Sequence, residues 1–185
     1  MFLLNIYSLK INMLSLSDNE FSVLNFLVRN FTERLTIRNI AQRLKFSPAG
    51  VFNILKKLEK QNIVAGEKLG SGLFYSINFE NKIAEYLAKI VLLYSEERLE
   101  KIETEKLRQA NAAILDKKTL LLITDNVSTL DISIPDIDVT IKTEDEIIES
   151  LRKKESAALN LLKNGAVLFG EDKIVEIIKK CVSRF

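Results

Sequence analysis

The stretch from Thr36 to Phe79 limits the possible fold most, because it holds two helix starts, a tight turn and a glycine-tipped hairpin in close succession. Thr36 can cap a first short helix, whose apolar residues recur at helical spacing: Ile37, Ile40, Ala41 and Leu44. The chain then breaks at Ser47-Pro48, where serine is a good N-cap and proline fits the first helical position. We therefore predict a second helix over residues 48–61.

A hairpin is predicted directly after this second helix. Ile63-Val64 and Leu73–Ile77 have the composition of short strands, and Gly70-Ser71-Gly72 between them supplies the positive φ angles that a tight turn needs. Upstream, Ser17 and Glu20 have the spacing of a capping box, which predicts another helix that ends near Asn30.

This order of elements resembles winged helix-turn-helix transcription regulators over roughly Ser17 to Phe79. The resemblance implies that helix 48–61 enters the major groove of duplex DNA, while the wing at 66–76 reaches the backbone or the minor groove. Asn53 could bond adenine bidentately, whereas lysines suit phosphates. The predicted DNA-contacting residues are Arg38, Ser47, Ala49, Gly50, Asn53, Lys56, Lys57, Lys60, Lys68 and Ser71. The alternative is that the lysines form an ordinary solvated helix face.

The balance of charge differs between the first 80 residues and the rest of the chain. Residues 1–80 carry ten Lys or Arg against six Asp or Glu, whereas residues 81–185 carry seventeen against nineteen. A lone Cys181 and the absence of histidine exclude disulfides within the chain, Cys/His zinc sites and histidine-based catalysis. No apolar run approaches the ~20 residues that span a bilayer. We expect a cytoplasmic protein with no cofactor, no bound metal and no membrane partner.

Residues 81–110 are predicted to form a long helical connector. Ile83, Leu87, Ile90 and Tyr94 are spaced as one apolar seam, which could pair with the same helix of a second subunit in a homodimer. The alternative is a helix packed only on its own chain. Residues 1–16 are predicted to form a strand, unless translation normally starts at Met13.

The remaining residues, 111–185, have a pattern of strand-like and helix-like segments that is typical of a small α+β domain. Strands are predicted at 119–124, 132–134 and 139–141, and residues 166–169 are either a strand or an extended segment. A capping box of Thr143 and Glu146 opens one helix, and two more are predicted at 156–163 and 171–182.

From Ala84 to Lys180 the sequence resembles minimal nucleotidyltransferase domains, through the segments AEYLAKI, TLLLITDN, VTIKTEDEII and ALNLLKNGAVLFGEDKIVEII. Active members carry a Gly-Ser turn and an Asp-x-Asp pair that holds magnesium. In one alignment Lys117 and Thr119 occupy the places of the two aspartates. In the other, Asp136 and Asp138 preserve both carboxylates on one strand face, but Ile123-Thr124 replaces Gly-Ser. In both alignments the departures from the family pattern favour a degenerate, non-catalytic domain.

The predicted fold class is therefore α+β, with a winged helix-turn-helix at 1–80, a connector at 81–110 and a nucleotidyltransferase-like domain at 111–185. The predicted function is that of a DNA-binding transcriptional regulator, whose C-terminal domain serves assembly or sensing. Two alternatives remain open: a magnesium-dependent nucleotidyltransferase using Asp136 and Asp138, and a winged helix that binds protein. A protein partner or a small-molecule effector also remains possible.

Overall fold

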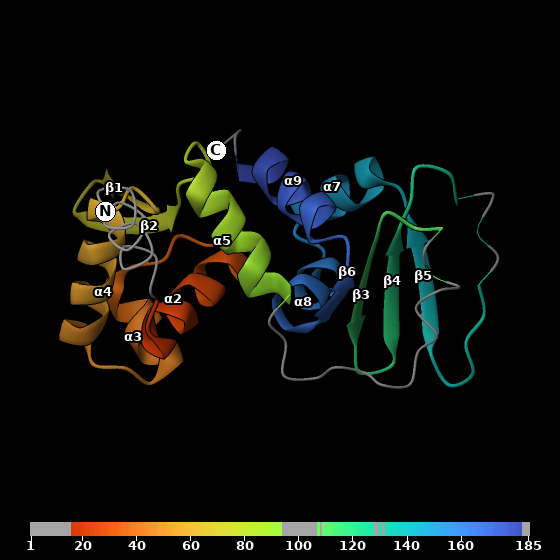
Figure 1. Cartoon of the computed structure of the whole chain (residues 1–185), viewed down its shortest axis with the longest axis horizontal. Helices are drawn as coiled ribbons and strands as arrows, with labels where there is room; N and C mark the ends of the chain where they lie inside the picture. Colours follow the sequence, from red (N-terminus) through yellow and green to blue (C-terminus); the bar gives the residue numbers. More distant parts are fainter. Residues whose placement is uncertain (1–15, 94–106, 108, 128–129, 131, 183–185) are drawn as a thin grey trace, which may run out of the picture.

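The computed structural model describes residues 16–93, 107, 109–127, 130 and 132–182. A three-helix unit with a β-hairpin forms one end of the molecule and a four-stranded sheet forms the other, with helices between them (Figure 1). The expected strand at 1–16 and the helical connector beyond residue 93 fall almost wholly outside the described residues.

The N-terminal unit consists of three helices, α2 (Asp18–Arg29), α3 (Ile37–Leu44) and α4 (Pro48–Lys60). Each begins at the cap that the sequence predicts. The Glu20 carboxylate accepts from the Ser17 N–H at 2.9 Å, and the Thr36 hydroxyl accepts from the N–H of Asn39. These local hydrogen bonds satisfy N–H groups that have no partner within their helices, and so they fix where the helices begin.

The hairpin is formed by β1 (Val64–Leu69) and β2 (Gly72–Ile77), joined by a two-residue turn at Gly70 and Ser71. Gly70 has a φ of +59°, the left-handed conformation predicted for this tip. The first strand differs from the predicted Ile63-Val64: it begins at Val64 and extends to Leu69, because each of its residues pairs with a residue of β2. The backbone of β2 also bonds to Leu35, whose carbonyl accepts from the Tyr75 N–H at 2.9 Å.

Helix α5 (Lys82–Leu93) follows the hairpin and contacts α2, α9 and β6. Its buried face consists of Ala84, Leu87, Ala88, Val91 and Leu92. The predicted seam is therefore divided: Leu87 is buried, Ile83 and Ile90 are exposed, and Tyr94 lies outside the described residues. The reason is that α5 packs on its own chain through a face rotated away from Ile83 and Ile90.

The C-terminal sheet has the strand order β5-β4-β3-β6. The strands β4 (Thr119–Ile123), β5 (Asp138–Lys142) and β6 (Ala166–Phe169) match predicted segments, whereas β3 (Ala112–Asp116) was not predicted. Strand β4 pairs parallel with β5 and antiparallel with β3, and β3 pairs antiparallel with β6.

The predicted strand at 132–134 is wrong. Ile132 and Ser133 have no strand structure, and Ile134 forms only an isolated bridge with Ile137 across a turn. The segment is apolar because Ile132 and Ile134 pack, half-buried, against the cluster on the outer face of the sheet.

Three helices complete the C-terminal half: α7 (Glu144–Arg152), α8 (Ser156–Asn164) and α9 (Glu171–Val182). The Thr143 and Glu146 capping box forms as predicted, and α8 ends before Gly165. A Cβ at Gly165 would lie 2.5 Å from both Ile114 Cγ2 and the Leu161 carbonyl oxygen, so only glycine allows β3 to approach this closely. Cys181 is buried on α9.

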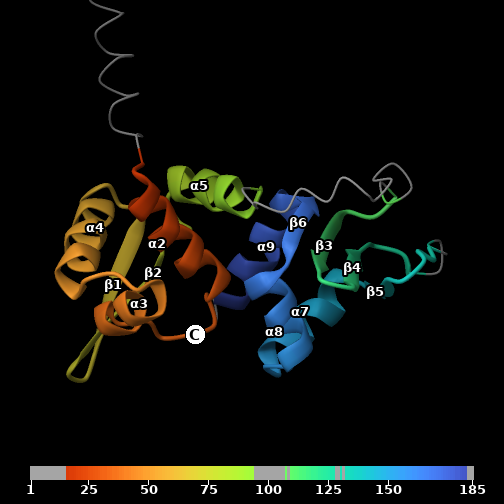
Figure 2. The same ribbon diagram turned by 90° about the horizontal axis from the view of Figure 1, so that it is seen from below.

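One hydrophobic core runs through both halves, from Val23 on α2 to Cys181 on α9. Helix α5 lies between the two halves in both views (Figures 1 and 2). The ion pairs of this junction include Lys89 with Asp172 at 2.6 Å and Lys179 with Glu85 at 2.8 Å. The two halves are therefore packed against each other through α5.

Candidate nucleic-acid interface

Helix α4 presents one buried and one exposed face. Val51, Leu55 and Leu58 are fully buried, which fixes the rotation of the helix about its axis. The N-terminus is fixed as well, since the Ser47 hydroxyl accepts from the Gly50 N–H at 3.1 Å and Pro48 occupies the first turn. The opposite face carries exposed residues: Ala49, Phe52, Asn53, Lys56 and Lys60.

The exposed face combines small, amide and basic side chains, as the sequence predicts. Ala49 lies exposed and Gly50 half-buried in the first turn, with Asn53 one turn further along. Phe52 is 43% exposed, and the Lys56 ammonium lies 5.9 Å from the centre of its ring. The predicted site did not include Phe52. An exposed aromatic residue on an otherwise polar helix face is the signal that could have identified it, because such a side chain can contact a thymine methyl group.

Lys57 differs from its lysine neighbours. Its ammonium lies 2.6 Å from the carboxylate of Glu20 on α2, and that carboxylate is almost completely buried. The predicted role of Lys57 as a phosphate contact therefore competes with an ion pair inside the domain. The sequence does not reveal this pair, since the two residues lie on different helices.

The other predicted contacts come from α3 and the hairpin. Arg38 lies exposed in the first turn of α3. Lys68 is exposed near the end of β1, opposite Leu73, and Ser71 is exposed in the turn. Helix α4 packs on β1, so the base of the hairpin lies beside α4 (Figure 2).

The two aspartates of the alternative enzymatic interpretation do not share a strand face. Asp136 lies in the turn between Ile134 and Ile137 with a φ of +62°, and Asp138 is the first residue of β5. The expected Asp-x-Asp strand is therefore wrong, because the chain turns at Asp136 before it joins the sheet. Among the described residues, no group of three or more acidic, histidine or cysteine side chains could hold a metal ion.

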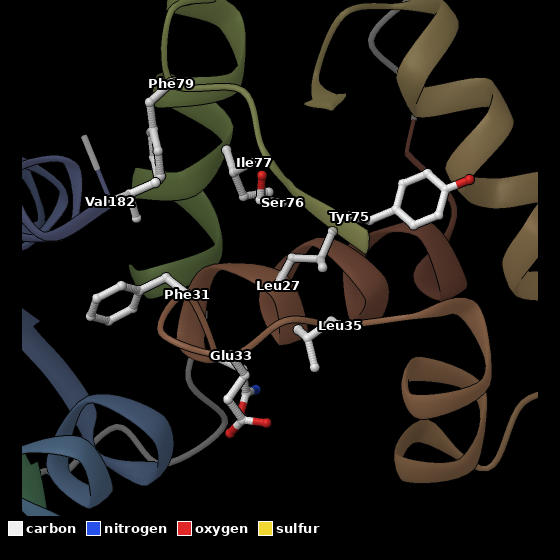
Figure 3. A pocket seen from close by; sticks show the side chains of 10 residues that line it. Leu27, Phe31, Glu33, Leu35, Tyr75, Ser76, Ile77, Phe79 and Val182 are labelled. Carbon is white, nitrogen blue, oxygen red and sulfur yellow. The ribbon is translucent and has the colours of Figure 1, made fainter. Parts of the chain in front are cut away.

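A narrow crevice lies between α2, β2 and the end of α9 (Figure 3). Its walls are mainly apolar side chains such as Leu27, Phe31 and Ile77, with Glu33 at one side. Its volume of about 10 Å³ is close to the least that a single water molecule needs. The crevice is therefore too small for a ligand.

The capped helices, their shared buried core and the hairpin define a winged-helix domain in which one face of α4 is exposed. Residues 14–70 match the model of the MarR family, so this region is of the MarR winged-helix DNA-binding type. The match begins shortly before α2, ends at the tip of the hairpin and covers less than a third of the chain. No curated protein matches the chain. None of the helices that the structure describes has the length and apolarity needed to cross a membrane.

Proposed function

We infer that this protein is a DNA-binding transcription regulator of the cytoplasm that reads duplex DNA through α4 and the β1–β2 wing. The observation that carries this inference is the exposed face of α4, where Asn53, Lys56 and Lys60 stand opposite a fully buried stripe. The match of residues 14–70 to the MarR family supports it.

In this proposal the N-terminal turns of α4 lie in the major groove. Ala49 and Gly50 allow close approach, and Asn53 is placed to bond an adenine edge. Lys56 and Lys60 contact phosphates, which position the helix without specifying sequence. The wing residues Lys68 and Ser71, together with Arg38 on α3 and Ser47 at the N-cap, complete the contact surface. Lys57 contributes chiefly through its ion pair with Glu20.

The active form in this proposal is a homodimer that pairs through α5. Four exposed apolar side chains follow one stripe of this helix at spacings of three, four and three residues: Ile83 (47% exposed), Tyr86 (61%), Ile90 (54%) and Leu93 (47%). Such spacing is that of a coiled-coil seam. A two-fold dimer that binds adjacent major grooves would place its recognition helices about 34–36 Å apart. The C-terminal domain then serves assembly or sensing.

DNA binding can be tested without knowledge of the operator, because phosphate contacts give low-salt affinity for any duplex. Fluorescence anisotropy with a random duplex would compare the natural protein with a Lys56→Glu, Lys60→Glu double variant. We expect the double variant to bind more weakly at every salt concentration. The plot of log affinity against log salt has a negative slope, and this slope should become less steep by roughly 0.9 for each phosphate that the variant no longer binds.

A matched control is the double variant Lys117→Glu, Lys118→Glu, which makes the same change in charge. Both lysines are exposed in the β3–β4 turn, in the half of the molecule away from α4 (Figure 1). The control should bind as the natural protein does. Equal losses of affinity in both variants would mean that only total charge matters. Absence of binding by the natural protein at low salt would contradict the proposal and favour a winged helix that binds protein.

A further inference from the structure

Two large apolar side chains are exposed among the described residues of the winged-helix unit, 16–79. They are Phe52 on α4, which is 43% exposed, and Leu73 on β2, which is 42% exposed. Phe52 belongs to neither of the hydrophobic clusters that the described residues form. Its ring therefore leaves apolar surface in water, and contact with a partner would remove that surface from water.

The place of Phe52 on α4 is fixed by the buried residues of the same helix. Val51 and Leu55 are fully buried, so the helix cannot rotate to bring Phe52 into the core. Residues three and four positions apart lie on the same side of a helix. Phe52 therefore lies between Ala49 and Lys56 along the exposed face. The small side chain of Ala49 leaves the N-terminal side of the ring open to a partner.

The Phe52 ring also has a basic neighbour. The Lys56 ammonium lies 5.9 Å from the centre of the ring, within the ~6 Å over which an aromatic face attracts a cation. In the proposed function Lys56 contacts a phosphate. That contact would hold the ring one turn nearer the N-terminus of α4, where a recognition helix comes closest to the bases.

The chemistry of phenylalanine restricts what the ring can recognise there. Its side chain has no hydrogen-bond donor or acceptor, so it cannot pair with the polar groups of the base edges. The C5-methyl group of thymine is the one apolar group that the four bases present in the major groove. A phenyl ring that replaces water at this methyl group distinguishes thymine from the other three bases.

We propose that Phe52 is a specificity-determining residue that contacts the C5-methyl group of a thymine in the major groove. This inference rests on the proposed function, because it requires α4 to lie in that groove. The next residue, Asn53, bonds an adenine edge in the proposed function. The preferred DNA site therefore has A·T pairs at the positions that these two side chains reach, in addition to the phosphate contacts.

The test begins with selection of a preferred site from a pool of random duplexes by the full chain. Each thymine of that site is then replaced in turn by deoxyuridine, which removes the methyl group and keeps every hydrogen-bonding group. Fluorescence anisotropy should show one thymine in each half-site whose replacement weakens binding of the natural protein about fourfold, the effect of burying one methyl group. Phe52→Ala should bind the thymine and deoxyuridine sites equally, whereas Phe52→Leu should keep the preference for thymine.

Val127→Ala is the matched control, because it truncates another exposed apolar side chain (38%) outside the winged-helix unit. It should prefer thymine as the natural protein does. Should Phe52→Ala fail to fold, Phe52→Gln gives the same decision, since it keeps the length of the side chain and replaces the ring by an amide.

The outcomes separate this inference from the proposed function. If the natural protein binds duplex DNA but no deoxyuridine substitution weakens its binding, the role of Phe52 is overturned and the proposed function stands. The same holds if Phe52→Ala distinguishes thymine from deoxyuridine as well as the natural protein does. If the natural protein binds no duplex at low salt, both proposals are contradicted.

Discussion

Lys57 on α4 and Glu20 on α2 form an ion pair of 2.6 Å that joins the two helices. Glu20 also closes the capping box by accepting from the Ser17 N–H at 2.9 Å. Burial alone would raise the pKa of Glu20, but the hydrogen bonds from Lys57 and Ser17 outweigh it and lower the pKa. One carboxylate thus fixes both the start of α2 and the position of α4 against it.

The first prediction follows from this pair. Replacing Lys57 by Gln leaves the buried Glu20 carboxylate with fewer partners, so the free energy of unfolding should fall by about 1 kcal/mol in urea titrations. Affinity for random duplex DNA should change little.

Lys60→Gln provides the comparison, since Lys60 is exposed on the same helix. It should alter stability by no more than about 0.5 kcal/mol and reduce the salt slope of DNA binding by roughly 0.9. If Lys57→Gln weakens DNA binding as much as Lys60→Gln and leaves stability intact, Lys57 releases Glu20 and contacts phosphate in the complex.

The second prediction concerns acid stability at the junction of the two halves. Hydrogen bonds from Lys179 and Lys89 to the Glu85 carboxylate outweigh burial and lower its pKa from 4.5 to about 2. Because the folded-state pKa is the lower one, the ionised carboxylate stabilises the fold fully above about pH 4.5, and this contribution is lost as pH falls toward 2.

Glu85→Gln should therefore lower stability near neutral pH and make stability fall less steeply between about pH 5 and pH 2. Urea unfolding across that range measures both effects. An unchanged slope in the variant would mean that Glu85 titrates alike in the folded and unfolded chain.

The third prediction compares two glycines that share a left-handed backbone but differ in surroundings. Gly170 has a φ of +80°, and a Cβ there would collide with the Asn111 carbonyl oxygen and lie 2.5 Å from Ala112 Cα. Gly70, at +59°, has nothing within 4 Å of such a Cβ. Gly70→Ala should cost about 1–2 kcal/mol from backbone strain alone. Gly170→Ala should cost a further 1–3 kcal/mol or so, because backbone atoms must move. Similar losses of stability in urea unfolding would contradict this account.

The parts of the fold that depend on neighbouring residues could be predicted from the sequence. Caps at Ser17, Thr36, Ser47 and Thr143 depend on residues three positions apart, and all four form as predicted. The exposed face of α4 was readable for the same reason, since helical periodicity separates it from the core. MarR-type winged-helix character at 14–70 agrees with the resemblance to winged helix-turn-helix regulators.

Features that depend on residues far apart in the chain could not be predicted from the sequence. The strand β3 is identified by its pairing with β4 and β6, and residues 132–134 look like a strand because they pack against the sheet without joining it. The same holds for the pairing of Lys57 with Glu20, because the two residues lie on different helices. The nucleotidyltransferase-like interpretation of residues 111–185 stays a prediction.

The last prediction tests the proposed dimer. Ile90 is 54% exposed in the middle of the apolar stripe on α5, so Ile90→Glu would place two like charges at the centre of a two-fold interface. We expect light scattering to change from twice the chain mass to the single-chain mass of 21.1 kDa, with the melting temperature nearly unchanged because Ile90 contributes little to the core. Val127→Glu, at another exposed apolar residue (38%), should remain dimeric. If the natural protein is already monomeric, or if the variant stays dimeric, the proposal that α5 forms a dimer interface is contradicted.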